Sequence, residues 1–241
     1  MADTVALLST EALTFAVGGI RAVNNVNFSL AERELRCLIG PNGAGKTTFF
    51  RCLTKIYRPT SGRINFRGQD ITRLATHEVA RLGVGIKTQV PSVFDGLTVR
   101  QNLQLAASRK HRRDAITRAA DAAIERLSLG KIAGNLAGGL SHGQRQWVEL
   151  GIVIASEPIL ILLDEPTAGM TRSEVEYTAQ LIRELNKMTA LIVVEHDLQF
   201  IRSLAAHVTV FHQGGILVEN DAAAVLCDPR VRDIYFGQGL K

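Results

Sequence analysis

The chain has 241 residues, of which 46% are hydrophobic and 21% charged, and a formal net charge of +5, the composition of a soluble globular protein with an ample core. No apolar run approaches the roughly 18 residues that cross a bilayer, and the N-terminus lacks the basic region of a signal peptide. We therefore expect a cytosolic chain rather than a membrane-spanning or secreted one.

The cysteines and the basic residues limit the kinds of site that the chain can carry. Cys37, Cys52 and Cys227 are odd in number and form no C-x-x-C pair. A disulfide framework or a zinc site is therefore not expected, and we predict buried, reduced thiols. The basic run RKHRR at residues 109–113 contains no aromatic residue, which argues against single-stranded nucleic acid, and we predict no nucleic-acid partner.

Hydrophobic patterning predicts mainly strands in the first third of the chain. The alternation up to about residue 35 predicts short antiparallel strands joined at Gly18–Gly19. The compact apolar run ELRCLIG predicts a buried strand, and KTTFFRCLT, which begins at Lys46, predicts a helix. The next predicted elements are strands in GRINFRGQDI and a helix over residues 73–82.

The second half of the chain first turns helical and then alternates. Residues 97–157 have the texture of helices. The elements predicted after them are a strand at ILILLDE, a helix at SEVEYTAQLIRELNKM, a strand at ALIVVEH, a helix at DLQFIRSLAA and a hairpin at HVTVFHQGGILVE. This order predicts an α/β fold with a parallel core, a helical insertion and an antiparallel edge.

The segment GPNGAGKT at residues 40–47 matches the pattern G-x-x-x-x-G-K-[ST] between a predicted buried strand and a predicted helix, as the motif requires. Its glycines let the backbone turn tightly, and its N–H groups and helix dipole cradle a β-phosphate. Lys46 is expected to reach the β- and γ-phosphates, Thr47 to bind Mg²⁺, and Thr48 to lie beside the α-phosphate. The predicted nucleotide-binding residues of this loop are Asn42, Gly43, Ala44, Gly45, Lys46, Thr47 and Thr48.

Charged and polar residues end two of the predicted parallel strands. Asp164 follows a strand predicted to be buried on both faces, at the edge where open α/β sheets bind ligands, and is expected to hold Mg²⁺ through water. Glu165 is expected to polarise the attacking water as a general base. His196 ends the strand of LIVVEHD and is expected to contact the γ-phosphate. These groups supply the positioning and charge neutralisation that phosphoryl transfer needs.

The segment LSHGQRQW at residues 140–147 has the pattern of a capping box, in which Ser141 is followed three residues later by Gln144. A helix that starts in this way presents N–H groups that suit an anion. The pattern alone fits both a simple helix cap and a second phosphate site.

Together these segments resemble the ATP-binding subunits of ABC transporters over nearly the whole chain. LSHGQ is similar to the signature of that family, which is usually L-S-G-G-Q. The resemblance implies that two nucleotide domains pack head to tail, so that Ser141, Gly143 and Gln144 of one chain contact the ATP held by the other. It also implies ATP and Mg²⁺ as cofactors and an ATPase coupled to solute transport.

The resemblance further implies how the chain is organised and what it binds. Residues 1–241 would form one ATPase domain, with a RecA-like P-loop NTPase core and an antiparallel β subdomain in 1–90 and 158–241 and a helical subdomain in 91–157. Gln89 matches a glutamine that touches Mg²⁺ and the attacking water, beside a groove for a permease helix. The implied partners are transmembrane permease subunits, a second ATPase subunit (self or paralogue) and, indirectly, a periplasmic binding protein. The chain would then lie on the inner face of the cell membrane.

The chain departs from the family pattern at three places. His142 replaces the usual signature glycine, and Thr171 stands where the family commonly has Asp or Asn. The position of the aromatic residue that stacks on adenine holds Val17, with Phe15 two residues earlier and therefore on the same face of a strand. Val17 and Phe15 are both candidate adenine contacts.

Within the family, ELRCLIGPNGAGKTT, LSHGQRQW, EPTAGMT and VFHQGGIL look most like urea-type members of the branched-chain amino acid and amide importers. FRCLTKIYRPTSG and AGNLAGG look more like the amino acid members themselves. The predicted function is the ATP-hydrolysing subunit of an importer for branched-chain amino acids, urea or related amides. The main alternative is a soluble ABC-type ATPase without a permease, such as one resembling the iron–sulfur assembly machinery. A ribosome-associated ABC protein and a P-loop kinase fit the motifs less well.

Overall fold

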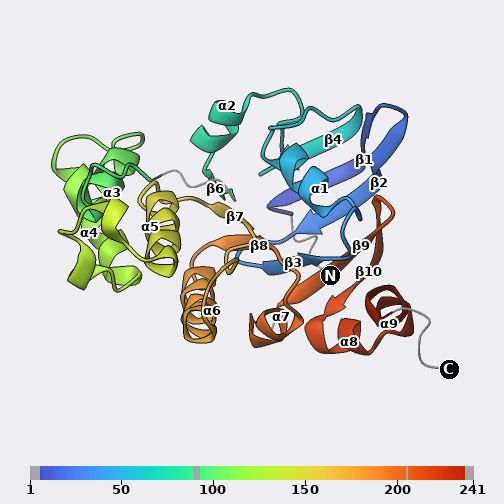
Figure 1. Cartoon of the computed structure of the whole chain (residues 1–241). Helices are drawn as coiled ribbons and strands as arrows, with labels where there is room; N and C mark the ends of the chain where they lie inside the picture. The colour runs from blue at the N-terminus through green and yellow to red at the C-terminus, as the bar shows by residue number, and fades with distance from the viewer. Residues whose placement is uncertain (1–5, 89–92, 205, 237–241) are drawn as a thin grey trace.

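The computed structural model describes residues 6–88, 93–204 and 206–236, which form a mixed α/β structure (Figure 1). The strands are β1 (Leu8–Val17), β2 (Ile20–Leu30), β3 (Leu35–Ile39), β4 (Ser61–Phe66), β5 (Gln69–Asp70), β6 (Val84–Lys87), β7 (Leu160–Asp164), β8 (Ala190–Val194), β9 (His207–His212) and β10 (Gly215–Asp221). The helices are α1 (Lys46–Leu53), α2 (Thr76–Arg81), α3 (Val99–Ala107), α4 (Asp114–Arg126), α5 (His142–Ile154), α6 (Arg172–Asn186), α7 (Leu198–Leu204), α8 (Ala222–Cys227) and α9 (Pro229–Phe236).

The larger sheet has the strand order β10-β9-β3-β8-β7-β6. Neighbouring strands from β9 to β6 pair in parallel, and β10 pairs antiparallel with β9. The apolar runs of β3, β7 and β8 are buried along their whole length, because elements cover both faces of the sheet. The predicted parallel core with an antiparallel edge is therefore confirmed.

Alternation along the central strands separates two hydrophobic cores. In β7, Ile161 and Leu163 pack with residues of α5, α6 and α7. Leu160 and Leu162 point to the other face and pack with α1 and with the strands of the smaller sheet. Burial on both faces fixes β7, so the carboxylates at its end are held on a rigid element.

The smaller sheet is antiparallel and has the order β2-β1-β4-β5. The turn at Gly18–Gly19 uses positive φ angles of 57° and 81°, which glycine adopts readily. The strands that it joins have 10 and 11 residues and are longer than the sequence pattern suggested. Helices α3, α4 and α5, which lie between β6 and β7 in the sequence, gather on the opposite side of the molecule from β1 and β2 (Figure 1).

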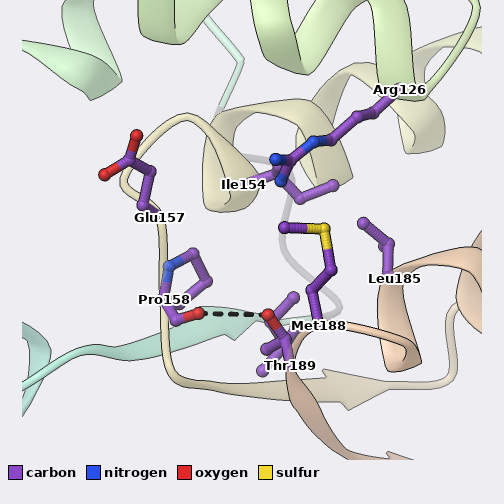
Figure 2. A pocket seen from close by; sticks show the side chains of 8 residues that line it. Arg126, Ile154, Glu157, Pro158, Leu185, Met188 and Thr189 are labelled. Atoms are coloured by element: carbon purple, nitrogen blue, oxygen red, sulfur yellow. Dashed lines mark hydrogen bonds between the residues drawn. The ribbon is translucent and has the colours of Figure 1, made fainter.

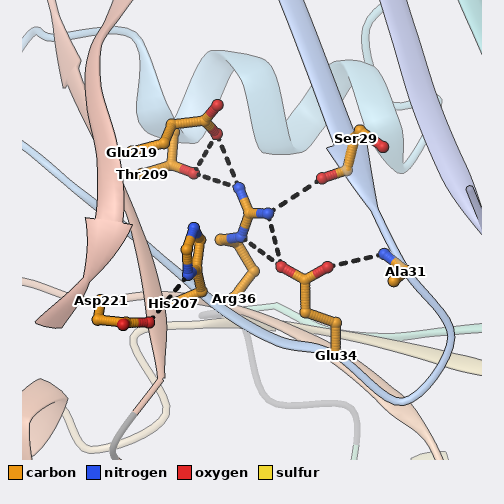
Figure 3. A network of polar contacts seen from close by, with 8 residues as sticks. All are labelled: Ser29, Ala31, Glu34, Arg36, His207, Thr209, Glu219 and Asp221. Carbon is orange, nitrogen blue, oxygen red and sulfur yellow. Dashed lines mark hydrogen bonds and ion pairs between the residues drawn. The ribbon is translucent and has the colours of Figure 1, made fainter. Parts of the chain in front are cut away.

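A network around Arg36 holds β3 to its neighbours (Figure 3). Arg36 is 7% exposed, and its guanidinium pairs with Glu34 at 2.6 Å and with Glu219 at 2.7 Å. It also donates to Thr209 Oγ1 at 2.9 Å and to the Ser29 carbonyl at 3.1 Å. This buried cation has both charge partners and hydrogen-bond acceptors, and it ties β3 to β9 and β10.

Several features differ from the sequence predictions. Strand β6 and helices α8 and α9 were not anticipated, because each is short and depends on packing against the rest of the chain. Cys37 and Cys52 are buried, and burial raises the pKa of their thiols to about 12 and about 11. Cys227 is exposed, so the expectation of a buried thiol is wrong at that position. In the described part of the chain, no helix combines the length and apolar character that a membrane span needs.

Candidate functional site

The loop predicted to bind phosphate joins the end of β3 to the start of α1. Gly40 and Gly45 have φ angles of 144° and 103°, in the region that favours glycine. A side chain at Gly40 would collide with the Phe211 carbonyl, and one at Gly45 would collide with the Ala22 carbonyl. Both glycines are therefore required by close backbone contacts as well as by the turn itself.

Inside this loop, Lys46 folds back onto the backbone. Its ammonium donates to the Gly40 carbonyl at 2.6 Å and to the Pro41 carbonyl at 3.0 Å. Burial lowers the pKa of Lys46, while the charges of Glu165 and Asp164 raise it. The Lys46 cation therefore lies within electrostatic reach of Glu165, the predicted general base, and of Asp164, the predicted Mg²⁺ ligand.

The other predicted residues of the loop differ in exposure. Asn42 and Gly43 are exposed at its tip, whereas Ala44 is buried. Thr47 and Thr48 are half-buried in the first turn of α1. The first turn of α1 thus presents two hydroxyl-bearing residues beside Lys46.

Tyr235 of α9 contacts the phosphate loop and was not predicted. Its hydroxyl oxygen accepts a hydrogen bond from the Gly40 N–H at 2.6 Å. Burial raises the pKa of Tyr235 to about 12, so the group is neutral near pH 7. A tyrosine close to the end of a chain gives no sequence signal for this contact.

We expect Tyr235→Phe to weaken nucleotide binding roughly fivefold or more, because the buried Gly40 N–H loses its only acceptor among the described residues. Titration of a fluorescent nucleotide would measure the change. Tyr177→Phe is the matched control, since its hydroxyl donates to the Leu127 carbonyl, far from the loop in sequence. Equal affinities in the two variants would show that Tyr235 does not support the loop.

Asp164 ends β7 as a buried carboxylate, only 4% exposed. Its Oδ1 has no hydrogen-bond partner among the described residues. Burial, and then the charge of Glu165, raise the pKa of Asp164 to about 6. A buried carboxylate oxygen without a partner fits a hard cation, which prefers oxygen ligands. No cluster of three or more His, Cys, Asp or Glu suited to a metal occurs in the described ranges, so such an ion would need further ligands from Thr47 and the nucleotide.

The raised pKa of Asp164 predicts a pH-dependent stability. In the folded chain the ionised form is disfavoured, so the cost is absent below the ordinary pKa of 3.8 and is fully present above about 6. In the absence of nucleotide and Mg²⁺, Asp164→Asn should therefore raise the free energy of unfolding by about 1–3 kcal/mol near pH 8 and change it little near pH 4. Chemical denaturation at the two pH values would measure this. An advantage that is larger in acid would contradict the prediction.

Glu165 and His196 come from neighbouring parallel strands and lie side by side. Glu165 adopts a φ of 46°, and its N–H donates to the Val194 carbonyl at 2.9 Å, which joins the ends of β7 and β8. The distance from Glu165 Oε1 to His196 Nδ1 is 4.0 Å. Their side chains are 32% and 66% exposed, so a water molecule and a substrate phosphate can reach both.

Glu195 supports this pair and was also missed. It is 1% exposed, and its Oε1 accepts from the Thr167 hydroxyl at 2.6 Å and from the Thr167 N–H at 3.2 Å. Its Oε2 accepts from the His196 N–H at 3.1 Å. Glu195 therefore fastens the loop after Glu165 to the end of β8. The available signal was a charged residue directly after an apolar strand.

The segment that resembles the signature forms the predicted capping box. Ser141 Oγ accepts from the Gln144 N–H at 3.3 Å, and Gln144 Oε1 accepts from the Ser141 N–H at 3.1 Å. Ser141 is exposed, and Gly143 is buried. In the described ranges no hydrogen bond or ion pair joins residues 141–144 to residues 40–48, and α5 lies well apart from α1 in Figure 1. One chain does not bring together the two helix starts that were predicted to bind phosphate.

Gln89, predicted to touch Mg²⁺ and water, lies outside the described residues. Just before it, Lys87 at the end of β6 pairs with Glu149 of α5 at 3.5 Å, and both side chains are buried. Burial lowers the pKa of Lys87 and raises that of Glu149, and the pair opposes both shifts. This unpredicted ion pair links the strand that leads to Gln89 with the helix that begins at the signature.

The two candidates for adenine differ in their surroundings. Phe15 stacks on Tyr57 with ring centroids 4.9 Å apart and an angle of 6° between the planes. Val17 is 62% exposed at the end of β1. One face of Phe15 is thus already covered, while Val17 offers an open aliphatic surface.

A depression of about 280 Å³ lies elsewhere, between α4, α5 and α6 (Figure 2). Pro158 and Thr189 in its lining precede β7 and β8, so it opens at the amino ends of these strands. The catalytic candidates stand at the carboxyl ends. This depression is therefore distinct from the candidate site.

The sequence is similar to those of known proteins. Residues 23–168 match the sequence model of the family described as ABC transporter. The chain is 33% identical over 251 residues to the high-affinity branched-chain amino acid transport ATP-binding protein BraF of Pseudomonas aeruginosa, covering 96% of this chain and 98% of that protein. It is 34% identical over 251 residues to LivG of Escherichia coli K12, which has the same descriptive name, with the same coverage.

A solved structure gives the same picture. The ADP conformation of MJ1267, an ATP-binding cassette of an ABC transporter, superposes with a TM-score of 0.88 at 27% sequence identity. The match covers 97% of this chain and 100% of that one. The predicted fold class is confirmed by this likeness.

Proposed function

The chain belongs to the family of ABC transporter ATP-binding subunits, which are ATPases coupled to transport, and we propose that it powers uptake of branched-chain amino acids, urea or related amides. The names of BraF and LivG, which are branched-chain amino acid transport ATP-binding proteins, support an amino acid as the transported solute. The segments LSHGQRQW and EPTAGMT, which look like urea-type members, are the reason to keep amides in the proposal.

The observation that carries the proposal is the meeting of Lys46 with Asp164, Glu165 and His196 at one edge of the sheet. Lys46 would leave the two loop carbonyls for the β- and γ-phosphate oxygens of ATP. Glu165 would accept a proton from water as the water oxygen bonds to the γ-phosphorus and the bond to the ADP oxygen breaks. His196 would hydrogen-bond the γ-phosphate.

Mg²⁺ fits the same site. Asp164 Oδ1, which lacks a partner among the described residues, would hold the ion through water, and the Thr47 hydroxyl would bind it directly. Bound there, the ion would neutralise charge that develops on the phosphate oxygens. Gln89 would contribute a further contact.

We also propose that two nucleotide domains form a head-to-tail dimer. The exposed capping box at Ser141 is a second anion-binding helix start that its own chain leaves away from the phosphate loop. In the dimer, Ser141, Gly143 and Gln144 would contact ATP held by the partner, and its hydrolysis would release the contact. The partner would be a second copy or a paralogue.

The permease would dock beside Gln89. Phe94 and Leu136 are both 57% exposed. Leu136 forms an isolated antiparallel β-bridge with Thr98, which follows Phe94 closely in the sequence. Exposed apolar side chains that lie close together are typical of a partner surface. The chain would therefore work on the inner face of the membrane, with a periplasmic binding protein completing the importer.

Uptake of labelled leucine and labelled urea tests the proposal in cells that carry either the native chain or Glu165→Gln. Loss of leucine uptake alone would assign the amino acid branch, and loss of urea uptake alone would assign the urea branch. If both persist, co-purification with membranes decides whether the chain is a transporter subunit at all.

A further inference from the structure

His142 makes a contact within its own chain that the sequence did not indicate. It is the first residue of α5, and its Nε2 lies 2.9 Å from the Ala168 carbonyl. The ring also covers Gly169, where an added side chain would lie 3.1 Å from the same nitrogen. Ala168 and Gly169 belong to the loop that follows Asp164 and Glu165. A glycine in place of His142 could make neither contact.

The tautomer of His142 follows from its partners. The Ala168 carbonyl can only accept, so Nε2 carries the proton. The Gln146 side chain lies 3.4 Å from the same nitrogen, and its Oε1 has no partner in the described part of the chain. The structure places the amide nitrogen of Gln146, Nε2, toward the imidazole, so the contact with the Ala168 carbonyl is the one assigned to the His142 N–H.

Glu174 of α6 forms a second link between the loop at residues 168–171 and the start of α5. One of its oxygens, Oε2, accepts from the N–H and the hydroxyl of Thr171, each at 2.8 Å. The other oxygen lies directly against Gly143, in the space that a side chain there would fill. Glu174 therefore joins Thr171 to Gly143, the residue that follows His142.

Farther along α5, Trp147 extends this contact. Its indole N–H donates to Thr178 Oγ1 at 2.9 Å, and its ring packs edge-on against Tyr177 with centroids 4.8 Å apart. The first turns of α5 therefore pack on the loop at residues 168–171 and on α6. His142 and Glu174 stand at the exposed end of this contact, next to Ser141.

We propose that His142 is a positioning residue that fixes the start of α5 to the loop at residues 168–171 of the same chain. Ser141 and this loop then approach the partner's ATP as one unit. The inference rests on the proposed head-to-tail dimer. Because His142 acts on the partner's site, its loss should slow hydrolysis without changing how a monomer binds nucleotide.

The test compares three variants of the full chain. His142→Ala removes the imidazole, and His142→Gln keeps an N–H donor of similar reach. His77→Ala is the matched control, an exposed histidine in the first turns of α2. Because His142→Ala loses one neutral hydrogen bond, we expect its kcat for ATP hydrolysis to fall about threefold to tenfold. Its KM for ATP and the affinity of the monomer for nucleotide should not change. His142→Gln should recover most of the loss.

Hydrogen exchange provides a readout that does not need activity. In the monomer without nucleotide, the amides of residues 168–171 should exchange faster in His142→Ala than in the native chain, and near the native rate in His142→Gln. Native exchange in His142→Ala overturns the contact. Faster exchange with native kcat, or equal losses in the Ala and Gln variants, overturns the positioning role.

The two proposals fail in different ways. If the rate of ATP hydrolysis is simply proportional to the concentration of the native protein, the dimer proposal fails. The exchange experiment still decides whether His142 holds the loop. If the rate of hydrolysis rises more steeply than the concentration of the native chain, the dimer proposal stands. If the His142 variants then hydrolyse ATP as fast as His77→Ala, the inference about His142 is wrong.

Discussion

Replacing Glu165 by glutamine should reduce steady-state ATP hydrolysis by about 10²–10⁴-fold while ATP remains bound. Glutamine has nearly the same shape but cannot accept the proton of the attacking water. Glu165 is partly exposed, lies 4.0 Å from His196 Nδ1 and is held at the end of a buried strand, so the variant should keep the fold. Without hydrolysis, the ATP-bound dimer should accumulate.

Phosphate release and size-exclusion chromatography in ATP would measure both effects for Glu165→Gln. Glu125→Gln, which changes an exposed carboxylate on α4, is the control and should behave like the native chain. Unchanged hydrolysis in Glu165→Gln would remove Glu165 as the general base. The water would then have to be activated by another group at the same edge of the sheet.

Replacing Ser141 by arginine should abolish hydrolysis although Ser141 lies outside the phosphate loop of its own chain. Loss of the helix cap alone costs about 1 kcal/mol, which is too little to stop turnover. The larger effect comes from a long cation at the helix start that is proposed to receive the partner's γ-phosphate. Binding of nucleotide by the monomer should survive, and its loss would contradict a contact across the dimer.

Thr98→Arg is the matched control for Ser141→Arg. Thr98 caps α3 with the same kind of capping box, formed with Gln101, but it is not part of the proposed nucleotide contact. It should therefore retain hydrolysis. Mixing Ser141→Arg with Lys46→Ala should restore part of the activity if the chain pairs with itself, because one of the two composite sites is then intact.

Much of the candidate site could be predicted because its signals are local. Lys46 and Thr47 occur in a fixed spacing between a strand and a helix, and that spacing alone positions them. Asp164 and His196 end apolar runs, and parallel strands place their carboxyl ends along one edge.

Other parts could not be predicted because their partners are distant in sequence. Helices α8 and α9 are short, and without the rest of the fold their patterns are too weak to indicate a helix. The Gly40 contact of Tyr235 depends on where α9 packs. Lys87 and Glu149 gave no local sign that they form a buried pair.

Patterns within a few residues were enough to predict the phosphate loop, the buried parallel strands and the capping box at Ser141. Only the packing of the described chain showed that His142 bonds the Ala168 carbonyl and that Glu195 holds Thr167. These contacts join separate elements, and no local pattern records which elements will meet. The physical reason is that hydrogen bonds between elements form only where the packing of both cores brings donor and acceptor together.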